Sequence, residues 1–368
     1  MVPKKNSNID YEIMIVGGGP AGISTWLHLQ KFAPELADRT LLVEKQIYPR
    51  DKLCGGALHF LGQKILTQLG VDINIPSISI HNTEYRFGKE VFYYNEQNHL
   101  QIIRRIEFDY FLAKIARERG LQLNEDEIFI DASHAKSGLI VKTNRGEYKV
   151  KVLIGADGAL SKVRSKMELP KKPHFAPAIE IFAPVNSCYD PEFDSNTAVI
   201  DFTPVAKGLQ GYVWHFPCII DGKPSMNHGI CDTHINTSKP RPNLKKILSH
   251  ELHRRKIICK PSSWSGYPVP WFADEIPLSQ ANILLVGDAA GIEPLIGGGI
   301  HLALMYGEVA AFTIIDAFRH NDFSFKEYNT QLHSHIVGKY IRKFTYLAFE
   351  VYNDRMNVID AMKKINKR

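Results

Sequence analysis

The chain has 368 residues, of which 44% are hydrophobic and 23% charged, and these ordinary globular values exclude a disordered, collagen-like or coiled-coil protein. At about 150 residues per domain, this length predicts about two domains. The formal charge of +6 is spread along the chain, so no basic block points to nucleic acid as a partner.

The cysteines and the N-terminus indicate a reducing compartment. The 5 cysteines include no pair at CxxC spacing, and no His cluster has metal-ligand spacing, so we expect neither disulfides nor a bound metal. The polar N-terminus does not have the pattern of a secretory signal, and no run of about 18 uninterrupted apolar residues predicts a membrane-spanning helix. We therefore expect a cytoplasmic protein.

The first elements along the chain are a strand, a glycine turn, a helix and a second strand. The apolar run YEIMIV at residues 11–16 predicts the first strand, ISTWLHLQKFA at 23–33 the helix and TLLVEK at 40–45 the second strand. This order is typical of a βαβ unit that binds a dinucleotide.

The glycine turn at residues 17–22 has the GxGxxG spacing, and the predicted cofactor-binding residues in it are Gly17, Gly19, Pro20, Ala21 and Gly22. The first glycine permits a tight turn, the second lets the backbone approach a pyrophosphate, and the third lets helix and strand pack closely. Glu44 and Lys45 end the second strand, where Glu44 would accept hydrogen bonds from a ribose diol.

The middle of the chain changes character twice. Residues 75–103 alternate and are rich in aromatic and β-branched side chains, as in an antiparallel sheet. Residues 105–119 have helical spacing, and residues 138–158 predict a meander of three strands. Residues 173–271 are rich in proline and have few long helical patterns, so we assign them to the second half of the inserted sheet.

The last third returns to buried strand and helix patterns. NILLVGDAAG at 282–291 predicts a buried strand running into a glycine turn, and residues 299–320 predict a long apolar helix. Residues 325–368 look helical, with one apolar stripe formed by Tyr340, Phe344, Leu347 and Val351. Four basic residues near the end favour a weak attraction to an anionic membrane surface: Lys363, Lys364, Lys367 and Arg368.

Three more motifs resemble those of FAD enzymes with the p-hydroxybenzoate hydroxylase fold. Residues 287–300, GDAAGIEPLIGGGI, resemble the second flavin-contacting segment of these enzymes. Residues 105–109, RIEFD, match their RxxFD motif, and residues 155–164 match GADGxxSxxR. With the glycine turn, four motifs follow in the order of that group.

The resemblance implies an α/β (α+β) architecture, in which a Rossmann-type FAD-binding domain with a βαβ start carries an inserted antiparallel-sheet substrate domain. Three parts follow: an FAD-binding domain of residues 1–74, 104–172 and 280–325, a sheet domain of residues 75–103 and 173–279, and C-terminal helices at 326–368.

The same resemblance implies roles for individual residues. Asp288 would take a hydroxyl of the ribityl or ribose chain, and Arg105 would pair with the pyrophosphate. Amides around Gly299 and Ile300 would face the N1–C2=O edge of the flavin, where negative charge gathers on reduction. Pro294 and Gly298 belong to this segment. Asp157 and Arg164 would touch the flavin and the reducing nicotinamide, or would be purely structural.

Two further stretches resemble the geranylgeranyl reductase family. Residues 48–58, YPRDKLCGGAL, resemble its (F/Y)PRDKxCGGxL segment, and residues 211–217, GYVWHFP, resemble its YxWxFP strand. The resemblance places Cys54 beside the isoalloxazine ring and makes Gly56 a cofactor-binding residue. Cys54 would supply a proton or only line the site, and Lys52 would be solvated or contact phosphate.

The second of these stretches predicts a wall for an apolar substrate. Tyr212, Trp214 and Phe216 alternate along the strand and would line a pocket for a long hydrocarbon, or else would only pack in a core. Three histidines lie in or near the motifs and are expected to be hydrogen-bonded bystanders: His59, His215 and His301.

The leading hypothesis is an FAD-dependent reductase that saturates a carbon–carbon double bond of an isoprenoid or similar apolar substrate. Only one dinucleotide fold is predicted, so electrons would come from NADPH that docks transiently or from reduced ferredoxin, an electron-carrier protein.

Three alternatives stay open. A flavin monooxygenase would use the same scaffold on an aromatic or polyketide substrate. A flavin halogenase has GWxWxIP where this chain has Tyr212 and Phe216, and its lysine has no convincing counterpart. A non-catalytic flavoprotein would sense redox state or bind a lipid.

Overall fold

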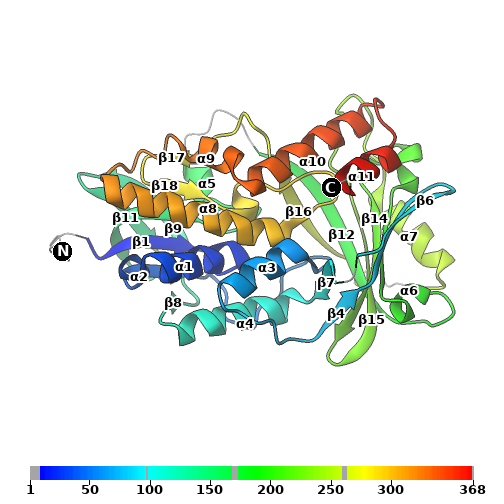
Figure 1. The fold of residues 1–368 in the computed structure, drawn as a ribbon, viewed down its shortest axis with the longest axis horizontal. Helices are drawn as coiled ribbons and strands as arrows, with labels where there is room; N and C mark the ends of the chain where they lie inside the picture. Colours follow the sequence, from blue (N-terminus) through cyan, green and yellow to red (C-terminus); the bar gives the residue numbers. More distant parts are fainter. Residues whose placement is uncertain (1–8, 97, 168–172, 259–262, 367–368) are drawn as a thin grey trace.

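The computed structural model of the protein describes residues 9–96, 98–167, 173–258 and 263–366. Two large sheets lie at opposite ends of an elongated molecule, with helices around them (Figure 1). Cys259, Lys367 and Arg368 lie outside the described residues.

The first sheet is built around β1 (Tyr11–Val16), which lies between β2 (Thr40–Val43) and β11 (Glu147–Gly155) and runs parallel to both. β8 (Gln122–Asn124) extends the sheet beyond β2, and β18 (Ile283–Leu285) extends it beyond β11, again in parallel. These apolar strands are mostly buried, as expected of a parallel sheet covered on both faces. Their carboxyl ends lie at one edge, and the predicted FAD motifs follow three of them: β1, β11 and β18.

The predicted three-stranded meander is shifted toward the N-terminus. β9 (Phe129–Ala135), β10 (Gly138–Thr143) and β11 pair antiparallel, but residues 138–158 contain only the last two of these strands. The reason is that residues 147–155 form one continuous nine-residue strand rather than two. A short β17 (Ser279–Gln280) pairs antiparallel with β18.

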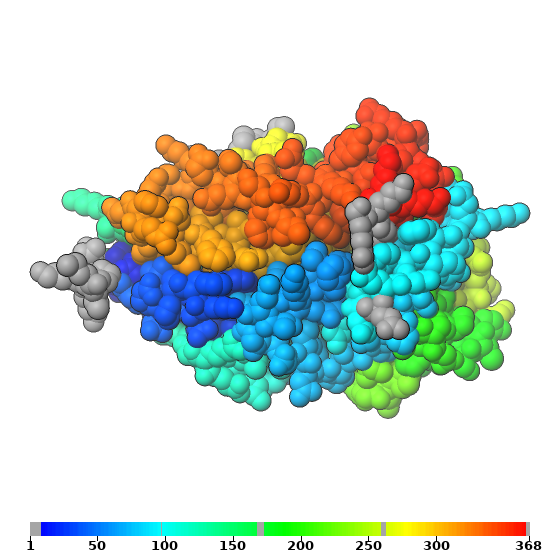
Figure 2. Space-filling view, in the orientation of Figure 1, coloured from blue at the N-terminus to red at the C-terminus, as the bar shows by residue number. Residues whose placement is uncertain are grey.

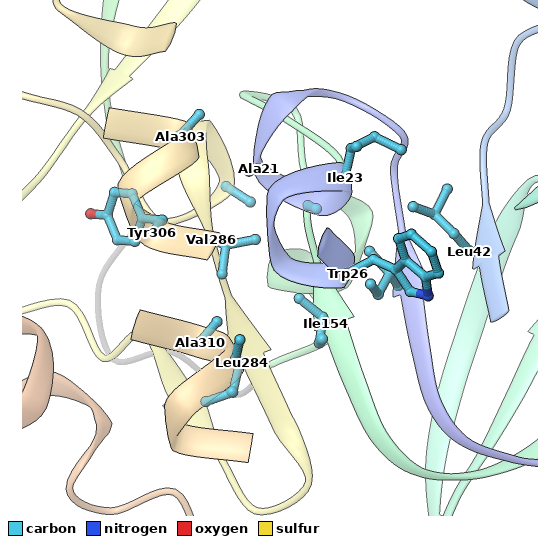
Figure 3. Close-up of a cluster of buried hydrophobic side chains, with 14 of the residues drawn as sticks. Ala21, Ile23, Trp26, Leu42, Ile154, Leu284, Val286, Ala303, Tyr306 and Ala310 are labelled. Carbon is cyan, nitrogen blue, oxygen red and sulfur yellow. The ribbon is translucent and has the colours of Figure 1, made fainter. Parts of the chain in front are cut away.

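Helices α1 (Pro20–Phe32) and α8 (Gly299–His320) pack side by side against the first sheet. Figure 3 shows Ala21, Trp26, Ala303 and Tyr306 among the buried apolar side chains of these two helices. The two helices approach closely at Gly307, where a Cβ would lie only 2.6 Å from Ser24 Oγ. Four more helices flank this end: α2 (Pro34–Ala37), α3 (Phe60–Gln68), α4 (Arg105–Glu118) and α5 (Lys162–Lys166).

The second sheet has seven strands in the order β16 (Ser265–Trp271), β12 (His174–Pro184), β15 (Lys223–Cys231), β14 (Val213–Ile220), β13 (Thr197–Asp201), β5 (Asn82–Phe87) and β6 (Glu90–Tyr94). All neighbours are antiparallel except β13 and β5, so the strands from the two distant stretches of the chain join in parallel. Helices α6 (Pro191–Asp194) and α7 (Leu244–Arg254) contact β14 and β15.

A small sheet connects the two ends of the molecule. It contains β3 (Ala57–His59), β7 (Leu100–Ile103) and β4 (Ser77–Ile80). β3 lies before residue 74 in the chain, and β4 and β7 lie between residues 75 and 103, so this sheet joins segments that the sequence assigns to different domains. The division into domains stays a prediction.

Of the three C-terminal helices, α10 (Ile336–Tyr352) and α11 (Val358–Asn366) cover the apolar face of the second sheet. The third, α9 (Tyr328–Ser334), contacts α8 and α10 and buries Tyr328 and Leu332 in the core of the first sheet. Figure 2 shows the three helices in orange and red along one side of the molecule, next to the cyan strands β5 and β6, which α11 contacts. Phe344, Leu347 and Val351 of α10 are buried, which confirms the predicted stripe, and Tyr340 is partly buried.

Helix α8 is long and apolar enough to cross a membrane by length and composition. However, 78% of its most apolar window is buried inside the protein. Since the helix packs against α1 and the first sheet, these properties are those of a core helix.

Candidate active site

Of the three motif glycines in the turn after β1, two are tightly packed and one is open. A Cβ on Gly17, where φ is +108°, would lie 2.4 Å from the carbonyl oxygen of Ala156, and a Cβ on Gly22 would lie 2.1 Å from the carbonyl oxygen of Gly17. A Cβ on Gly19 would meet only guanidinium nitrogens, 3.7 Å away on Arg105 and 3.9 Å on Arg50. The backbone at Gly19 is therefore free to approach a ligand between two cations, as a pyrophosphate requires.

Glu44 is held in a fixed position beside this turn. Its carboxylate accepts hydrogen bonds from the backbone N–H of Gly18 (2.9 Å) and of Gln46 (3.0 Å), and it pairs with Arg50 at 3.2 Å. Glu44 is buried at the end of β2, where the sequence predicts the ribose-binding acid. Lys45 beside it is exposed.

Arg105 is the first residue of α4. Its guanidinium is held in a fixed position by two hydrogen bonds to the carboxylate of Asp109, both of 2.7 Å. Arg50 reaches the same carboxylate at 3.0 Å, and its buried Nε has no hydrogen-bond partner. Two buried arginines thus face one aspartate and Glu44 beside Gly19. Arg50 was not among the predicted site residues, although it belongs to the quoted segment 48–58.

The segment after β11 is tied to the segment after β18. Asp157 accepts hydrogen bonds from Ser161 Oγ (2.5 Å) and from the backbone N–H of Lys162 (2.7 Å), so its carboxylate holds the start of α5. Arg164 donates to the carbonyl oxygens of Ala159 (2.6 Å) and Ala289 (2.9 Å). Arg164 thus holds the two loops together, and Asp157 holds its own loop, which favours the structural alternative for both side chains.

Asp288 lies in the loop after β18 and pairs with Lys52 at 2.7 Å. Burial disfavours the charged carboxylate, but Lys52, with Arg105 and Arg164, outweighs it and lowers the pKa of Asp288. Lys52 is therefore neither simply solvated nor far from the site. Glu293, which the sequence did not single out, accepts from the backbone N–H of Leu295 (2.7 Å) and Gly298 (2.6 Å) and shapes the loop that leads into α8.

The N-terminus of α8 faces open space. Gly298 caps the helix without a side-chain hydrogen bond, and a Cβ on Gly299 would meet only Ile292 and Asp288, at 3.5 Å and 3.8 Å. This leaves room for a ligand at the positive end of a 22-residue helix.

Cys54 lies where the two halves of the site meet. Its backbone N–H donates to Glu180 Oε1 (3.1 Å), and its Sγ accepts from the backbone N–H of Gly56 (3.4 Å). Burial raises the pKa of the Cys54 thiol, so it is protonated at neutral pH. A Cβ on the neighbouring Gly55 would lie 3.2 Å from the ring of Phe216 and 3.4 Å from Trp214 Nε1.

The aromatic side chains at 212, 214 and 216 lie on one face of the sheet, in the apolar cluster that includes α10 and α11. Tyr212 donates to the carbonyl oxygen of Ile296 (2.5 Å), and Trp214 Nε1 donates to Asn227 Oδ1 (2.8 Å). On the opposite face, His215 is hydrogen-bonded to His228 (2.7 Å), so it is the predicted bystander.

One continuous cavity of about 730 Å³ runs from the glycine turn to this aromatic wall. Every predicted site residue except Gly22 and Arg164 lines it, and Gly22 has the packing position that its motif implies. Five residues close the far end of the cavity: Tyr85, Tyr94, Ile200, Tyr340 and Ile365. Four of them were not predicted as site residues, and Tyr340 was predicted only in an apolar core stripe. These come from segments far apart in the chain, so no local motif marks them.

Two histidines of this cavity behave differently. His59 caps α3 by accepting from the backbone N–H of Leu61 (3.4 Å), and burial lowers its pKa to about 4. His301 is buried and neither ring nitrogen has a hydrogen-bond partner, so the expectation of a hydrogen-bonded bystander is wrong for His301. Among the described residues, no three His, Cys, Asp or Glu side chains are grouped to hold a metal ion.

Comparisons with known proteins agree with this geometry. An uncharacterised protein of Methanosarcina barkeri is 25% identical over 345 residues, covering 91% of this chain and 84% of its own length. The digeranylgeranylglycerophospholipid reductase 2 of Methanosphaera stadtmanae is 26% identical over 367 residues, covering 91% and 86%. The menaquinone reductase of Mycobacterium tuberculosis is 24% identical over 316 residues, covering 82% and 75%. No family model matches the chain.

Solved structures show the same fold. A geranylgeranyl bacteriochlorophyll reductase-like protein of Thermoplasma acidophilum superposes with a TM-score of 0.75 at 20% identity, covering 97% of this chain and 90% of that one. A flavin-dependent halogenase superposes with a TM-score of 0.71 at 18% identity, covering 96% and 69%.

The protein is an FAD-dependent oxidoreductase with the p-hydroxybenzoate hydroxylase-like fold. The similarity over most of the chain to several archaeal digeranylgeranylglycerophospholipid reductases supports the geranylgeranyl reductase family for it.

Proposed function

We propose that this protein reduces carbon–carbon double bonds of an isoprenoid or similarly apolar substrate. The reductase names of its relatives support this reaction, and the digeranylgeranyl and menaquinone names support a substrate with a polyprenyl chain. The cavity is long enough to reach from the cofactor motifs to an aromatic chamber, as a chain-like substrate requires.

The observation that carries the proposal is the junction at Cys54. Gly55 has the rings of Trp214 and Phe216 directly against its backbone, so the loop of the FAD side forms part of the wall of the apolar chamber. A substrate in the chamber would lie next to a protonated thiol and next to the start of α8.

The chain's own residues would divide the work between binding and proton supply. When bound, reduced FAD supplies a hydride to one carbon of the double bond. The backbone at Gly19, Arg50 and Arg105 would hold the pyrophosphate, and Glu44 and Asp288 would hold hydroxyl groups. Cys54 would give a proton to the other carbon. The apolar side chains of the chamber would keep water away from the reacting atoms.

The test is a mass measurement under anaerobic conditions. The flavin-loaded protein is reduced with dithionite and mixed with polyprenyl substrates that carry a digeranylgeranylglycerol or a menaquinone head. We expect reoxidation of the flavin and a gain of two hydrogens in the product. A product that gains oxygen, and only in air, would make the protein a monooxygenase and would overturn the proposal.

The electron donor is proposed to be NADPH that docks transiently or reduced ferredoxin. The basis is that the described residues contain a single dinucleotide-binding βαβ unit, the one at Gly17–Gly22. Stopped-flow reduction of the bound flavin by each donor separates the two. A reduction rate that saturates with NADPH supports direct docking, and reduction only by ferredoxin supports the carrier protein.

We also propose a peripheral contact with anionic membrane through the exposed side of α10. Ile336, Lys339, Lys343 and Tyr346 follow one another at helical spacing there, and Ile336 and Tyr346 are 55% and 59% exposed. Flotation with vesicles containing phosphatidylglycerol tests this contact. The double variant Ile336→Ser, Tyr346→Ser should lose flotation, whereas Ile258→Ser, an exposed apolar site elsewhere, should keep it. Flotation that the double variant retains would contradict the contact.

A further inference from the structure

Glu180 is a buried carboxyl that the proposed chemistry has not yet used. It lies on β12, where it is 4% exposed, and its two oxygens accept from the Cys54 backbone N–H (3.1 Å) and from Asn227 Nδ2 (3.2 Å). It has no ion pair among the described residues, unlike the buried carboxylates Glu44 and Asp109 nearby. A buried carboxyl without a cation favours its protonated form.

The charges around Glu180 are mixed and do not compensate its burial. Burial and the charge of Asp51 raise the pKa of Glu180. The hydrogen bonds from Asn227 and Cys54 and the charge of Arg104 lower it. Burial is the largest effect, so the pKa is raised. The Cys218 thiol, whose pKa burial raises to about 12, lies on β14, which β15 separates from the strand of Glu180. Lys52 and Arg105 line the same space, but both are engaged with other carboxylates.

A second, small cavity lies behind the Cys54 loop. Its volume is about 10 Å³, close to the space that one water molecule needs. Glu180, Cys54 and Asn227 line it, together with Arg104 and Phe182. Phe182 is 37% exposed, and Arg104 reaches toward Asp221, whose side chain is 87% exposed. Glu180 therefore lies between the main cavity and a water-sized space near the surface, and it lines both.

We propose that Glu180 is the group that returns a proton to Cys54 after each reduction, with solvent entering through the small cavity as the source. This rests on the proposed reductase function. The hydride brings two electrons and one hydrogen to the first carbon, and the C–H bond at the second carbon forms with the proton of the Cys54 thiol. The S–H bond breaks and leaves a thiolate. The proton of Glu180 then moves to the thiolate, and Glu180 regains a proton from water.

The first test needs no substrate. In the flavin-free protein, the pH dependence of Cys54 alkylation by iodoacetamide, measured by peptide mass spectrometry, gives the pKa of the thiol. In the wild type, the Glu180 carboxylate is negative at the pH where Cys54 ionises and opposes a second negative charge. Glu180→Gln should therefore move the alkylation midpoint to lower pH, and the exposed Cys188 serves as the internal control. An unchanged midpoint would show that the two groups are not coupled.

The second test is the pH profile of flavin reoxidation by substrate after dithionite reduction, under conditions of repeated turnover. We expect the wild-type rate to fall as pH rises through the pKa of Glu180. Glu180→Gln should lower the rate about 10-fold or more and remove this fall, and Glu180→Asp should restore part of the rate. Asn227→Ala removes a hydrogen bond that favours the charged form, so it should move the fall to higher pH.

A merely structural role of Glu180 predicts a lower rate with an unchanged pH dependence, and that outcome would overturn the inference. Flavin binding, measured by absorbance, shows whether each variant is folded. A wild-type protein that binds flavin but does not reduce any polyprenyl substrate overturns the proposed function instead. An active Glu180→Gln variant with the wild-type profile overturns only the role of Glu180.

Discussion

The two ends of the cavity are built in different ways. At the FAD end, backbone atoms set the shape: Gly17 and Gly22 have no room for a Cβ, and loop amides bind buried carboxylates such as Glu44 and Glu293. At the chamber end, side chains set the shape, and they come from β5, β14, α10 and α11. A backbone-built site tolerates few substitutions, whereas a wall of apolar side chains can change one residue at a time. Substitutions at the cofactor end should therefore have large effects on folding or FAD binding, and substitutions in the chamber should have smaller, graded effects on substrate binding.

The largest effect is expected at Gly17. Gly17→Ala places a Cβ 2.4 Å from the Ala156 carbonyl oxygen at a φ of +108°, so the turn must move. We expect a loss of about 3 kcal/mol or more in the free energy of unfolding of the flavin-free protein. Thermal unfolding followed by circular dichroism measures it.

The matched control for this variant is Gly19→Ala in the same turn. Its Cβ has no neighbour nearer than 3.7 Å, so the flavin-free protein should unfold within about 1 kcal/mol of the wild type. Equal destabilisation by both substitutions would show that the turn is not packed as described, and the contrast between its positions would be lost.

The next effect concerns binding without folding. Gly19→Val extends a branched side chain into the space between Arg105 and Arg50, where the pyrophosphate is proposed to lie. We expect a stable protein whose FAD affinity falls about 100-fold, or about 2.7 kcal/mol. Fluorescence titration of the flavin-free protein measures this. A variant that binds FAD normally would place the pyrophosphate elsewhere.

This contrast also explains what the sequence could predict. The elements of the FAD end follow from patterns within short windows. The predicted strand at 11–16 and the predicted apolar helix at 299–320 have the observed bounds. The predicted FAD residues line one cavity because their motifs follow parallel strands whose carboxyl ends meet at one edge.

The chamber could be predicted only in part, for a physical reason. Tyr212, Trp214 and Phe216 were found because their strand resembles YxWxFP and they alternate along it. Tyr85, Tyr340 and Ile365 meet them only through sheet pairing and helix docking across the chain. Glu180 has no motif of its own. Its meaning depends on Asn227 and on the Cys54 loop, which pack against it from other segments.

In the chamber, a wall substitution should affect the substrate and not the cofactor. Trp214→Leu keeps the site apolar but removes the ring that lies against Gly55 and faces the cavity. We expect an increase of about 10-fold in KM for a polyprenyl substrate, about 1.4 kcal/mol of lost contact, with FAD affinity unchanged. Steady-state kinetics and flavin titration on the same preparation test it. An equal loss of FAD affinity would mean that the two ends are not separate.

The smallest effect is expected where the two ends touch through a single hydrogen bond. The Tyr212 hydroxyl, on the chamber wall, donates to the carbonyl oxygen of Ile296, which lies in the loop that Glu293 holds against the start of α8. Tyr212→Phe leaves that carbonyl without its partner and should cost about 1 kcal/mol of stability and lower FAD affinity a few-fold, in addition to any effect on substrate.

Tyr306→Phe is the matched control, because the Tyr306 hydroxyl on α8 donates to the Gly291 carbonyl oxygen (3.0 Å), inside the FAD end. It should cost similar stability with no change in KM, since Tyr306 does not line the cavity. If Tyr212→Phe changes KM but leaves FAD affinity as in the wild type, the loop is held by Glu293 alone and the chamber does not support the cofactor site.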